Sequence, residues 1–190
     1  MPRPKILSDE DVLAVAHRLI HEVGPEALTF ARLAEASALS ASTLVQRFKS
    51  KAGLIQSTLL YAWDHLDAKT ATLAAEMPRN PGGAVDLLVA LSRSYGEIED
   101  YANGLLVLRE DIRDPVLRAR GRTWKRSLSS ALEACFADLP GTPPGIGLLL
   151  ASHWQGSLLW WSFDPRGRVE RFVEDSLLGF IDAVVPKRRK

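Results

Sequence analysis

Residues 29–51, TFARLAEASALSASTLVQRFKSK, decide the fold because they have the layout of two short helices joined by a tight turn. Thr29 and Ser40 are residue types that cap helix N-termini, and each precedes a short amphipathic segment. On the second segment, Leu44 and Phe48 lie one turn apart and would face inward together. An ordinary pair of amphipathic helices has the same spacing, so the outward-facing residues must distinguish it from a helix-turn-helix.

The outer face of the second helix carries short hydroxyls, an amide and cations, which hydrogen-bond base edges and phosphates. No acidic residue occurs from position 36 to 63, so nothing in this stretch repels a phosphate backbone. We expect Gln46 and Arg47 to help read bases, whereas Thr29, Lys49 and Lys51, with Thr43, mainly hold phosphates. The complete set of DNA contacts expected from the motif is Thr29, Ser40, Ala41, Ser42, Thr43, Val45, Gln46, Arg47, Lys49 and Lys51.

The flanking sequence predicts two more helices. Ser8 followed by three acids starts a first helix, and Gly24-Pro25 ends it. Ser50 can cap a long helix that runs to about Met77. Ahead of the first helix, Pro2 and Pro4 keep Arg3 and Lys5 extended, where they either reach an adjacent groove or make no contact.

Three short helices, the third presented to DNA, and a long fourth helix resemble the TetR family of bacterial transcriptional regulators. The detailed match is LTFARLAEASALSASTLVQRFKSKAGL, residues 28–54, and the resemblance covers about residues 8–66. It implies an all-α fold of about nine helices. Residues 1–66 would form the DNA-binding domain, with its motif at about 29–48, and residues 67–190 a helical domain for ligand sensing and dimerisation. The implied function is a ligand-responsive homodimeric repressor that binds a palindromic double-stranded operator.

Several positions depart from the family pattern. Ala38 stands where the turn usually carries glycine, and a left-handed conformation there would cost on the order of 1 kcal/mol more. Val45 replaces the usual tyrosine, Arg47 the usual histidine, and Ala52-Gly53 a common acidic pair. These departures keep an alternative open. In this alternative, the chain is a ligand-binding helical protein whose DNA-binding domain is degenerate, and the protein acts through a protein partner.

Composition narrows the classes further. The formal net charge is +1, which argues against a non-specific polycationic binder. The single cysteine, Cys135, excludes an internal disulfide and suits a cytoplasmic protein, and no signal peptide or membrane span is evident. No catalytic motif, cofactor motif or complete metal site is present, so we expect no enzyme and no cofactor. His17 and His21 have the spacing of a metal half-site, but no third ligand is marked and surface histidines are expected there.

The last two predicted helices favour self-association. Residues 146–163 are apolar nearly all round, so this helix must be covered on both sides. Residues 167–185 supply a second apolar stripe, and two such helices from each subunit would make a four-helix interface; packing within one subunit is the alternative. The expected interface residues are Leu149, Gly156, Leu159, Phe172, Val173, Leu177, Phe180, Ile181 and Val184.

The C-terminal domain also carries aromatic residues with a few polar groups among them. That combination suits a small aromatic or amphipathic ligand, although core and dimer contacts account for many such aromatics. The residues expected to line the ligand site are Tyr95, Tyr101, Arg109, Trp124, His153, Trp154 and Trp160.

Overall fold

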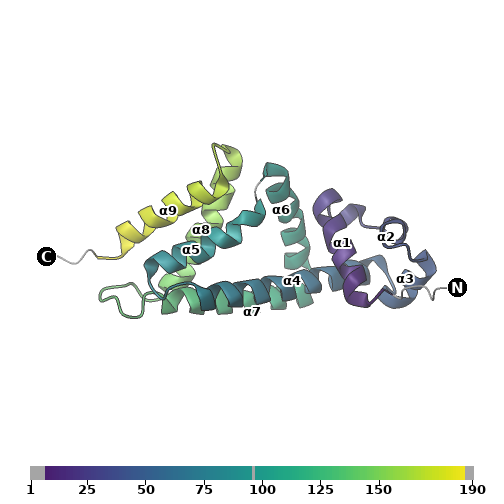
Figure 1. Ribbon diagram of the computed structural model, residues 1–190, viewed down its shortest axis with the longest axis horizontal. Helices are drawn as coiled ribbons and strands as arrows, with labels where there is room; N and C mark the ends of the chain where they lie inside the picture. Colours follow the sequence, from purple (N-terminus) through teal and green to yellow (C-terminus); the bar gives the residue numbers. More distant parts are fainter. Residues whose placement is uncertain (1–6, 96, 187–190) are drawn as a thin grey trace. The chain divides into compact units, whose positions relative to one another are not determined.

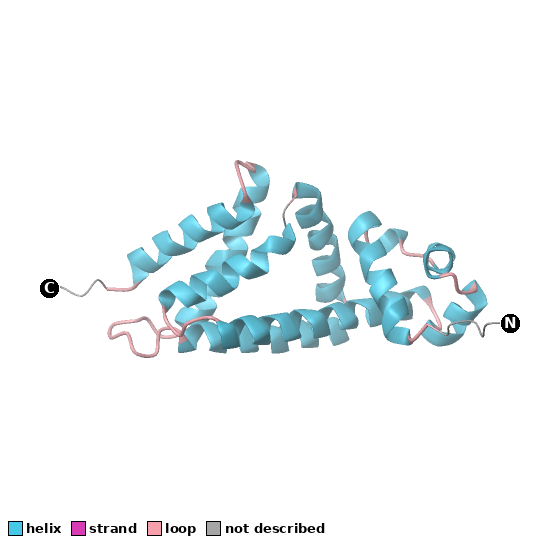
Figure 2. Ribbon diagram, viewed as in Figure 1, coloured by secondary structure: helices cyan, strands magenta, loops and turns pink. Residues whose placement is uncertain are grey.

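The computed structural model describes residues 7–95 and 97–186, and these contain nine α-helices, two 3-10 turns and no strand (Figures 1 and 2). The predicted all-α fold is therefore confirmed. The α-helices are α1 Asp9–Val23, α2 Phe30–Ser37, α3 Ala41–Phe48, α4 Lys51–Glu76, α5 Pro81–Ser92, α6 Ile98–Arg113, α7 Pro115–Ala134, α8 Ile146–Phe163 and α9 Val169–Val184. The 3-10 turns are η1 Pro25–Ala27 and η2 Arg93–Tyr95.

The chain divides into two compact units. The first comprises Met1–Leu66 and Ala102–Gly121, and the second comprises Asp67–Tyr101 and Arg122–Lys190. Helices α4, α6 and α7 each contribute residues to both units. Residues 102–121 therefore group with the N-terminal helices, although they lie far beyond them in the sequence.

Side chains predicted to cap the first helices do so. Ser8 and Asp11 form a reciprocal capping box at α1, with Asp11 N donating to Ser8 Oγ over 3.1 Å and Ser8 N donating to Asp11 Oδ2 over 3.0 Å. Gly24 ends α1 with φ 79°, a left-handed conformation that favours glycine. Ser50 Oγ accepts a hydrogen bond from Gly53 N at the start of α4.

The core of the first unit joins α1–α4 to parts of α6 and α7. Its buried side chains are Val12, Ala16, Ile20, Leu28, Leu33, Leu44, Phe48, Leu54, Leu59 and Leu117. Polar pairs reinforce the packing of α4: Gln56 Nε2 donates to Asp114 Oδ2 (2.8 Å), and the Trp63 indole donates to Asp111 Oδ1 (3.0 Å). These contacts hold the first half of α4 to residues more than 45 positions later.

In the second unit, α9 packs against α5 and α8 (Figure 1). Most of α5 is buried, which its nearly continuous apolar sequence requires. Val169, Val173 and Leu177 of α9 are fully buried. At the N-terminal end of α8, a Cβ on Gly147 would lie 2.1 Å from the Ser129 carbonyl oxygen of α7. Only glycine therefore allows α8 to start this close to α7.

The sequence predicts a helix from about Ala84 to Tyr95 and another from Pro115 to Leu139, and the structure differs from both. Helix α5 starts at Pro81 rather than Ala84, because Asn80 Oδ1 accepts from Gly83 N (3.0 Å) and caps the helix earlier. Helix α7 ends at Ala134 rather than Leu139, because the chain then follows turns such as Cys135 N to Leu132 O (3.0 Å). Among the helices the structure describes, none is both long enough and apolar enough to cross a membrane.

Candidate nucleic-acid interface

The N-terminus of α3 gathers three hydroxyl groups. Ser40 Oγ accepts from Thr43 N over 3.1 Å, which confirms Ser40 as the helix cap. The hydroxyls of Ser42 and Thr43 each lie 2.8 Å from Ser40 Oγ. Thr29 caps α2 in the same way, accepting from Arg32 N over 3.2 Å. A helix N-terminus lined by hydroxyls is suited to an anionic partner such as phosphate.

One face of α3 packs inward and the other is open. Leu44 and Phe48 are buried, as predicted, and fix the rotation of the helix. The side chains this leaves exposed are Ala41, Ser42, Val45, Gln46 and, just beyond the helix, Lys49. The exposed face thus combines a hydroxyl, an amide, a cation and an apolar group 43% exposed at Val45, which together can contact base edges and thymine methyl groups.

Arg47, predicted to help read bases, is engaged within the first unit in this structure. Its guanidinium donates to the Leu7 carbonyl oxygen (2.9 Å) and forms an ion pair with Asp9 (3.1 Å), leaving the side chain only 20% exposed. The guanidinium therefore lies at the start of α1, where it joins α3 to the first turn of α1. Forty residues separate Arg47 from Leu7, so local spacing carries no signal of this contact.

Lys51 is also engaged within the first unit. Its Nζ donates to the carbonyl oxygen of Glu26 in η1, although the side chain remains exposed. This bond holds the start of α4 to the segment after α1. A phosphate contact by Lys51 would have to compete with it, unlike one by Lys49. Arg3 and Lys5 lie outside the described residues.

The turns around α3 use unusual backbone conformations. Ala38 adopts φ 56° and ψ 25°, so the predicted left-handed turn forms without glycine. Lys49 follows α3 with φ 66°. A Cβ on Gly53 would lie 2.4 Å from the Phe48 carbonyl oxygen, which explains why glycine occurs at this position of α4. Each turn sets the angle at which α3 projects from its neighbours.

In the second unit, four predicted ligand residues form two aromatic pairs. Tyr95 and Tyr101 meet edge to face with ring centroids 5.5 Å apart, and Trp124 and Trp154 lie 6.4 Å apart. Burial raises the pKa of both tyrosines above the usual value. The two indoles donate to Thr70 Oγ1 (3.0 Å) and Ser92 Oγ (2.8 Å), respectively. These polar atoms therefore serve the packing of the unit.

The other three predicted ligand residues lie elsewhere. Arg109 belongs to the first unit and forms a 2.8 Å ion pair with Glu26. His153 stacks on Phe180 (4.5 Å) and contacts Ser176 Oγ at 2.9 Å, so it faces α9. Trp160 is 69% exposed on the outer side of α8. His153, Trp154 and Trp160 therefore have different surroundings, although they lie close together in the sequence of α8.

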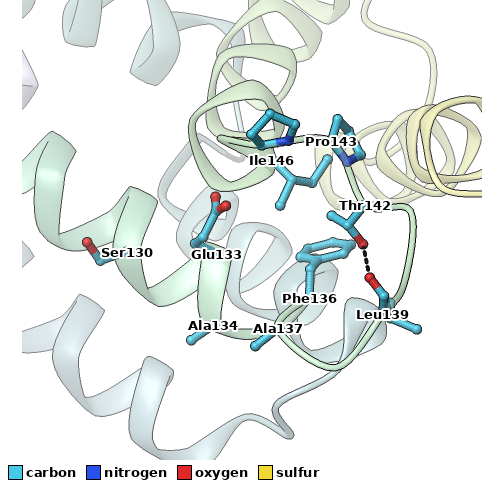
Figure 3. A pocket seen from close by; sticks show the side chains of 10 residues that line it. Ser130, Glu133, Ala134, Phe136, Ala137, Leu139, Thr142, Pro143 and Ile146 are labelled. Atoms are coloured by element: carbon cyan, nitrogen blue, oxygen red, sulfur yellow. Dashed lines mark hydrogen bonds between the residues drawn. The ribbon is translucent and has the colours of Figure 1, made fainter.

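Two open cavities lie among the described residues of the second unit. The larger, about 440 Å³, lies beside the end of α7 and the following loop, with Phe136, Thr142 and Ile146 in its wall (Figure 3). The smaller, about 260 Å³, is lined by residues of α4, α5 and α7 and of the segments that follow α4 and α7, and these residues include Arg79, Leu87 and Cys135. Burial raises the pKa of the Cys135 thiol, which disfavours the reactive thiolate. Neither cavity is lined by the predicted ligand residues.

The predicted dimer residues fall into two groups. Leu149, Leu159 and Phe172 are exposed, as an interface residue of an isolated subunit should be. Val173 and Leu177 are fully buried within the subunit, which corrects their assignment: the stripe at this spacing on α9 packs on α5 and α8. Gly156, Phe180, Ile181 and Val184 are half-buried.

An exposed apolar surface remains on α8 and α9. Leu148, Trp160, Phe163 and Leu178 belong to this surface but were not among the predicted interface residues. Apolar residues surround α8 on all sides, so spacing alone cannot select the outer face of this helix. A Cβ on Gly156 or Gly179 would meet nothing within 4 Å, so neither glycine is required by packing inside the subunit. This α8–α9 surface consists of Leu148, Leu149, Leu159, Trp160, Phe163, Phe172 and Leu178.

The helix-turn-helix, with its capped and outward-facing second helix, defines the class: an all-helical protein with an N-terminal helix-turn-helix domain. Residues 12–58 match the family model described as bacterial regulatory proteins, tetR family. The resemblance to the TetR family is thereby confirmed, and the chain has the fold of a TetR-family transcriptional regulator with a DNA-binding N-terminal domain. A comparison with curated proteins found no match.

Solved structures share this fold at low sequence identity. A transcriptional regulator from Rhodococcus sp. Rha1 is 17% identical, with 94% of this chain and 100% of that chain covered and a TM-score of 0.72. A candidate regulator from Saccharomonospora viridis, solved with choline, is 18% identical over 93% and 96% of the chains, with a TM-score of 0.72. AibR, solved with isovaleryl coenzyme A and operator DNA, is 17% identical over 87% and 94%, with a TM-score of 0.62.

Proposed function

We propose that this protein is a ligand-responsive transcriptional repressor that binds a palindromic operator as a homodimer. The observation that carries the proposal is the exposed face of α3, where Ser42, Val45 and Gln46 project beside the hydroxyl-lined helix N-terminus. No acidic side chain occurs in residues 36–63 to oppose a phosphate backbone. The AibR structure, which contains operator DNA, supports DNA binding by this fold.

In this proposal, Gln46 reads a base and Ser42 and Val45 contact neighbouring base edges. Thr29, Thr43 and Lys49 hold phosphates and fix the register of α3 in the major groove. Arg47 acts indirectly: its bonds to Leu7 and Asp9 keep α3 and α1 in a fixed relation. Arg47, which replaces the usual histidine, is thus a cation with a structural role. Val45, which replaces the usual tyrosine, offers an apolar contact where the tyrosine would offer a hydroxyl.

Dimerisation follows from the α8–α9 surface. Seven large apolar side chains are exposed there, and covering them with a second copy removes them from water. The open space beside Gly156 and Gly179 gives room for helices of a second copy to approach closely. A two-fold dimer would present two α3 helices to successive major grooves, about 34 Å apart.

Ligand sensing is proposed for the second unit. The cavity of about 260 Å³ beside Leu87 and Cys135 offers an apolar wall with one cation, Arg79, which suits an amphipathic ligand. The neighbours solved with choline and with isovaleryl coenzyme A support small-molecule binding by this fold. Because α4, α6 and α7 run through both units, a ligand that favours one arrangement of these helices would change the separation of the two α3 helices.

A gel-shift titration with the DNA flanking its own gene tests the proposal. The wild type should bind a short palindromic site, and Gln46→Ala should lose about 1–3 kcal/mol of binding free energy while relaxing preference at one base pair. Lys49→Ala should weaken binding to all sequences and lower the salt slope by about one unit. Lys69→Ala, which removes an exposed cation of α4 in the second unit, is the matched control and should bind normally.

Failure to bind any flanking DNA at low salt would reject DNA-directed repression and favour the alternative of a head that acts through a protein partner. For the ligand, the amphipathic probe 1-anilinonaphthalene-8-sulfonate should bind saturably and reduce operator affinity. Leu87→Trp, which fills the smaller cavity, should weaken binding of the probe. Equal binding of the probe by this variant would place the ligand site elsewhere.

A further inference from the structure

Helix α1 carries two histidines whose ring nitrogens converge. His17 Nε2 and His21 Nε2 lie 3.1 Å apart, and their rings are nearly perpendicular with centroids 4.6 Å apart. The two residues are one helical turn apart, so their side chains share a face. Tyr61 of α4 lies beside His17, with ring centroids 6.1 Å apart.

The separation of these nitrogens fits two ligands of one metal ion. Zinc binds imidazole nitrogen at about 2.0–2.1 Å, so two nitrogen ligands on one ion lie about 3.3 Å apart at a tetrahedral angle and about 2.9 Å apart at a right angle. The observed 3.1 Å lies between these values. We propose that His17 and His21 chelate a late first-row divalent cation, represented here by Zn²⁺, on the surface of the DNA-binding unit.

The surroundings keep the pair ready to bind metal. Asn103 Nδ2 donates to the His21 carbonyl oxygen over 2.8 Å, which holds the last turn of α1 in place. His21 itself is exposed, so an ion can reach the pair directly from solvent.

Water completes the coordination shell in this proposal. Within residues 7–95 and 97–186, no three side chains of His, Cys, Asp or Glu converge on one point, so the chain supplies two ligands. His65 packs on Tyr61 with ring centroids 4.2 Å apart, and Tyr61 in turn faces His17 at 6.1 Å. Two imidazoles and water suit borderline cations such as Zn²⁺, Ni²⁺ or Cu²⁺, whereas Mg²⁺ and Ca²⁺ prefer oxygen ligands.

Calorimetric titration of untagged, chelator-treated protein with ZnCl₂ at pH 7.5 tests the site. The wild type should bind one Zn²⁺, and His21→Gln should weaken binding about tenfold or more, because one of two protein ligands is lost. His153→Asn removes a histidine of the second unit and is the matched control, which should bind as the wild type does. MgCl₂ should produce no saturable binding.

A second readout separates chelation from a loss of folding. In a histidine-labelled sample, Zn²⁺ should shift the ring resonances of His17 and His21 and leave those of His153 unchanged, and added chelator should reverse the shift. His21 is exposed, so His21→Gln should keep the wild-type circular dichroism spectrum. Equal Zn²⁺ affinity in the wild type and His21→Gln, or unshifted His17 and His21 resonances, would overturn the proposal and leave the pair as a simple N–H to N hydrogen bond.

Discussion

Asp111 is a buried carboxyl group in the first unit, and it is held by a single side-chain donor of α4. The Trp63 indole donates to its Oδ1 over 3.0 Å. Burial, opposed by this hydrogen bond and assisted by the charges of Asp114 and Glu110, raises the pKa of Asp111 to about 6. The charged form is therefore disfavoured in the folded state, and the residue ties the stability of this unit to pH.

Asp111→Asn should stabilise the protein at neutral pH. Because the folded pKa is about 6 and the ordinary value is 3.8, the stabilising contribution of protonated Asp111 is complete below pH 4 and is lost as pH rises through 6. Asparagine keeps an acceptor for Trp63 without the charge. At pH 7.5, urea denaturation should give a gain of about 1–2 kcal/mol after allowance for solvent screening.

The gain from Asp111→Asn should disappear when the same measurement is made below pH 4. Asp100→Asn provides the matched control, because Asp100 is an exposed aspartate of α6. A variant that is no more stable than the wild type at pH 7.5 would contradict the burial argument.

Ala38 is a second residue whose backbone conformation opposes its residue type. Its φ of 56° is left-handed, a conformation that costs an L-residue about 1 kcal/mol relative to glycine. Ala38→Gly should therefore raise the free energy of unfolding by up to about 1 kcal/mol, less the added entropy of the unfolded chain. Denaturation in urea measures the gain, and Ala36→Gly, in the last turn of α2 and exposed, should instead destabilise.

At the scale of single elements, the side-chain caps of α1, α2 and α3 were the most predictable feature. Ser8, Thr29 and Ser40 have side chains that can accept from the helix backbone, and all three do so. This chemistry is local, within three residues, so the sequence displays it directly. The end of α7 was placed too late because its last apolar residues, Cys135 and Phe136, continue the helical spacing after the backbone has turned.

Helix α8 starts without a side-chain cap of its own and relies on α7. Glu133 accepts hydrogen bonds from Gly145 N (3.2 Å) and Gly147 N (2.7 Å), so its carboxylate lies at the positive end of the α8 dipole. Glu133→Ala leaves these N–H groups without their acceptor. We expect a loss of about 1 kcal/mol of stability, measured by thermal unfolding.

Glu174→Ala, on α9, is the control for Glu133→Ala because its carboxylate pairs with Arg171 rather than with a helix end. If both variants unfold at the same temperature as the wild type, the carboxylate contributes no more than an ordinary surface charge.

At the scale of the whole molecule, the fold class could be predicted from the sequence. Side-chain contacts between residues far apart in the sequence could not. The motif at 29–51, through its resemblance to the TetR family, predicted an all-α chain of about nine helices. Arg47, whose partners are Leu7 and Asp9, was assigned to DNA because local patterns show an outward cation and cannot show the start of α1 folding beneath it. The burial of Val173 and Leu177 likewise depends on which helices pack on α9.

The proposed dimer shows the same limit of local patterns. Apolar periodicity identified α8 and α9 as the interface helices, but the exposure of side chains in the structure is needed to select the face that a second copy would cover. Leu149 is 45% exposed and Phe163 74% exposed, whereas a Cβ on Gly156 would meet nothing within its own subunit. Gly156→Arg should therefore leave the subunit folded but block close approach of a second copy. Sedimentation should show a shift from dimer to monomer. Operator affinity should fall, because a monomer has one DNA-binding unit and can contact only one half-site.

Ala71→Arg places the same side chain at an exposed small residue of α4 and should remain dimeric. An interface of this kind should bury more than about 1,000 Å² in total, which makes the wild-type dimer stable at micromolar concentration. Gly156 lies in the second unit and α3 in the first, so the substitution leaves the DNA-binding surface unchanged. If a folded Gly156→Arg monomer binds a palindromic site as tightly as the wild type, DNA binding does not depend on dimerisation. That result would also remove the basis for ligand control through the spacing of two α3 helices, since control of that kind acts only when both helices contribute to the affinity.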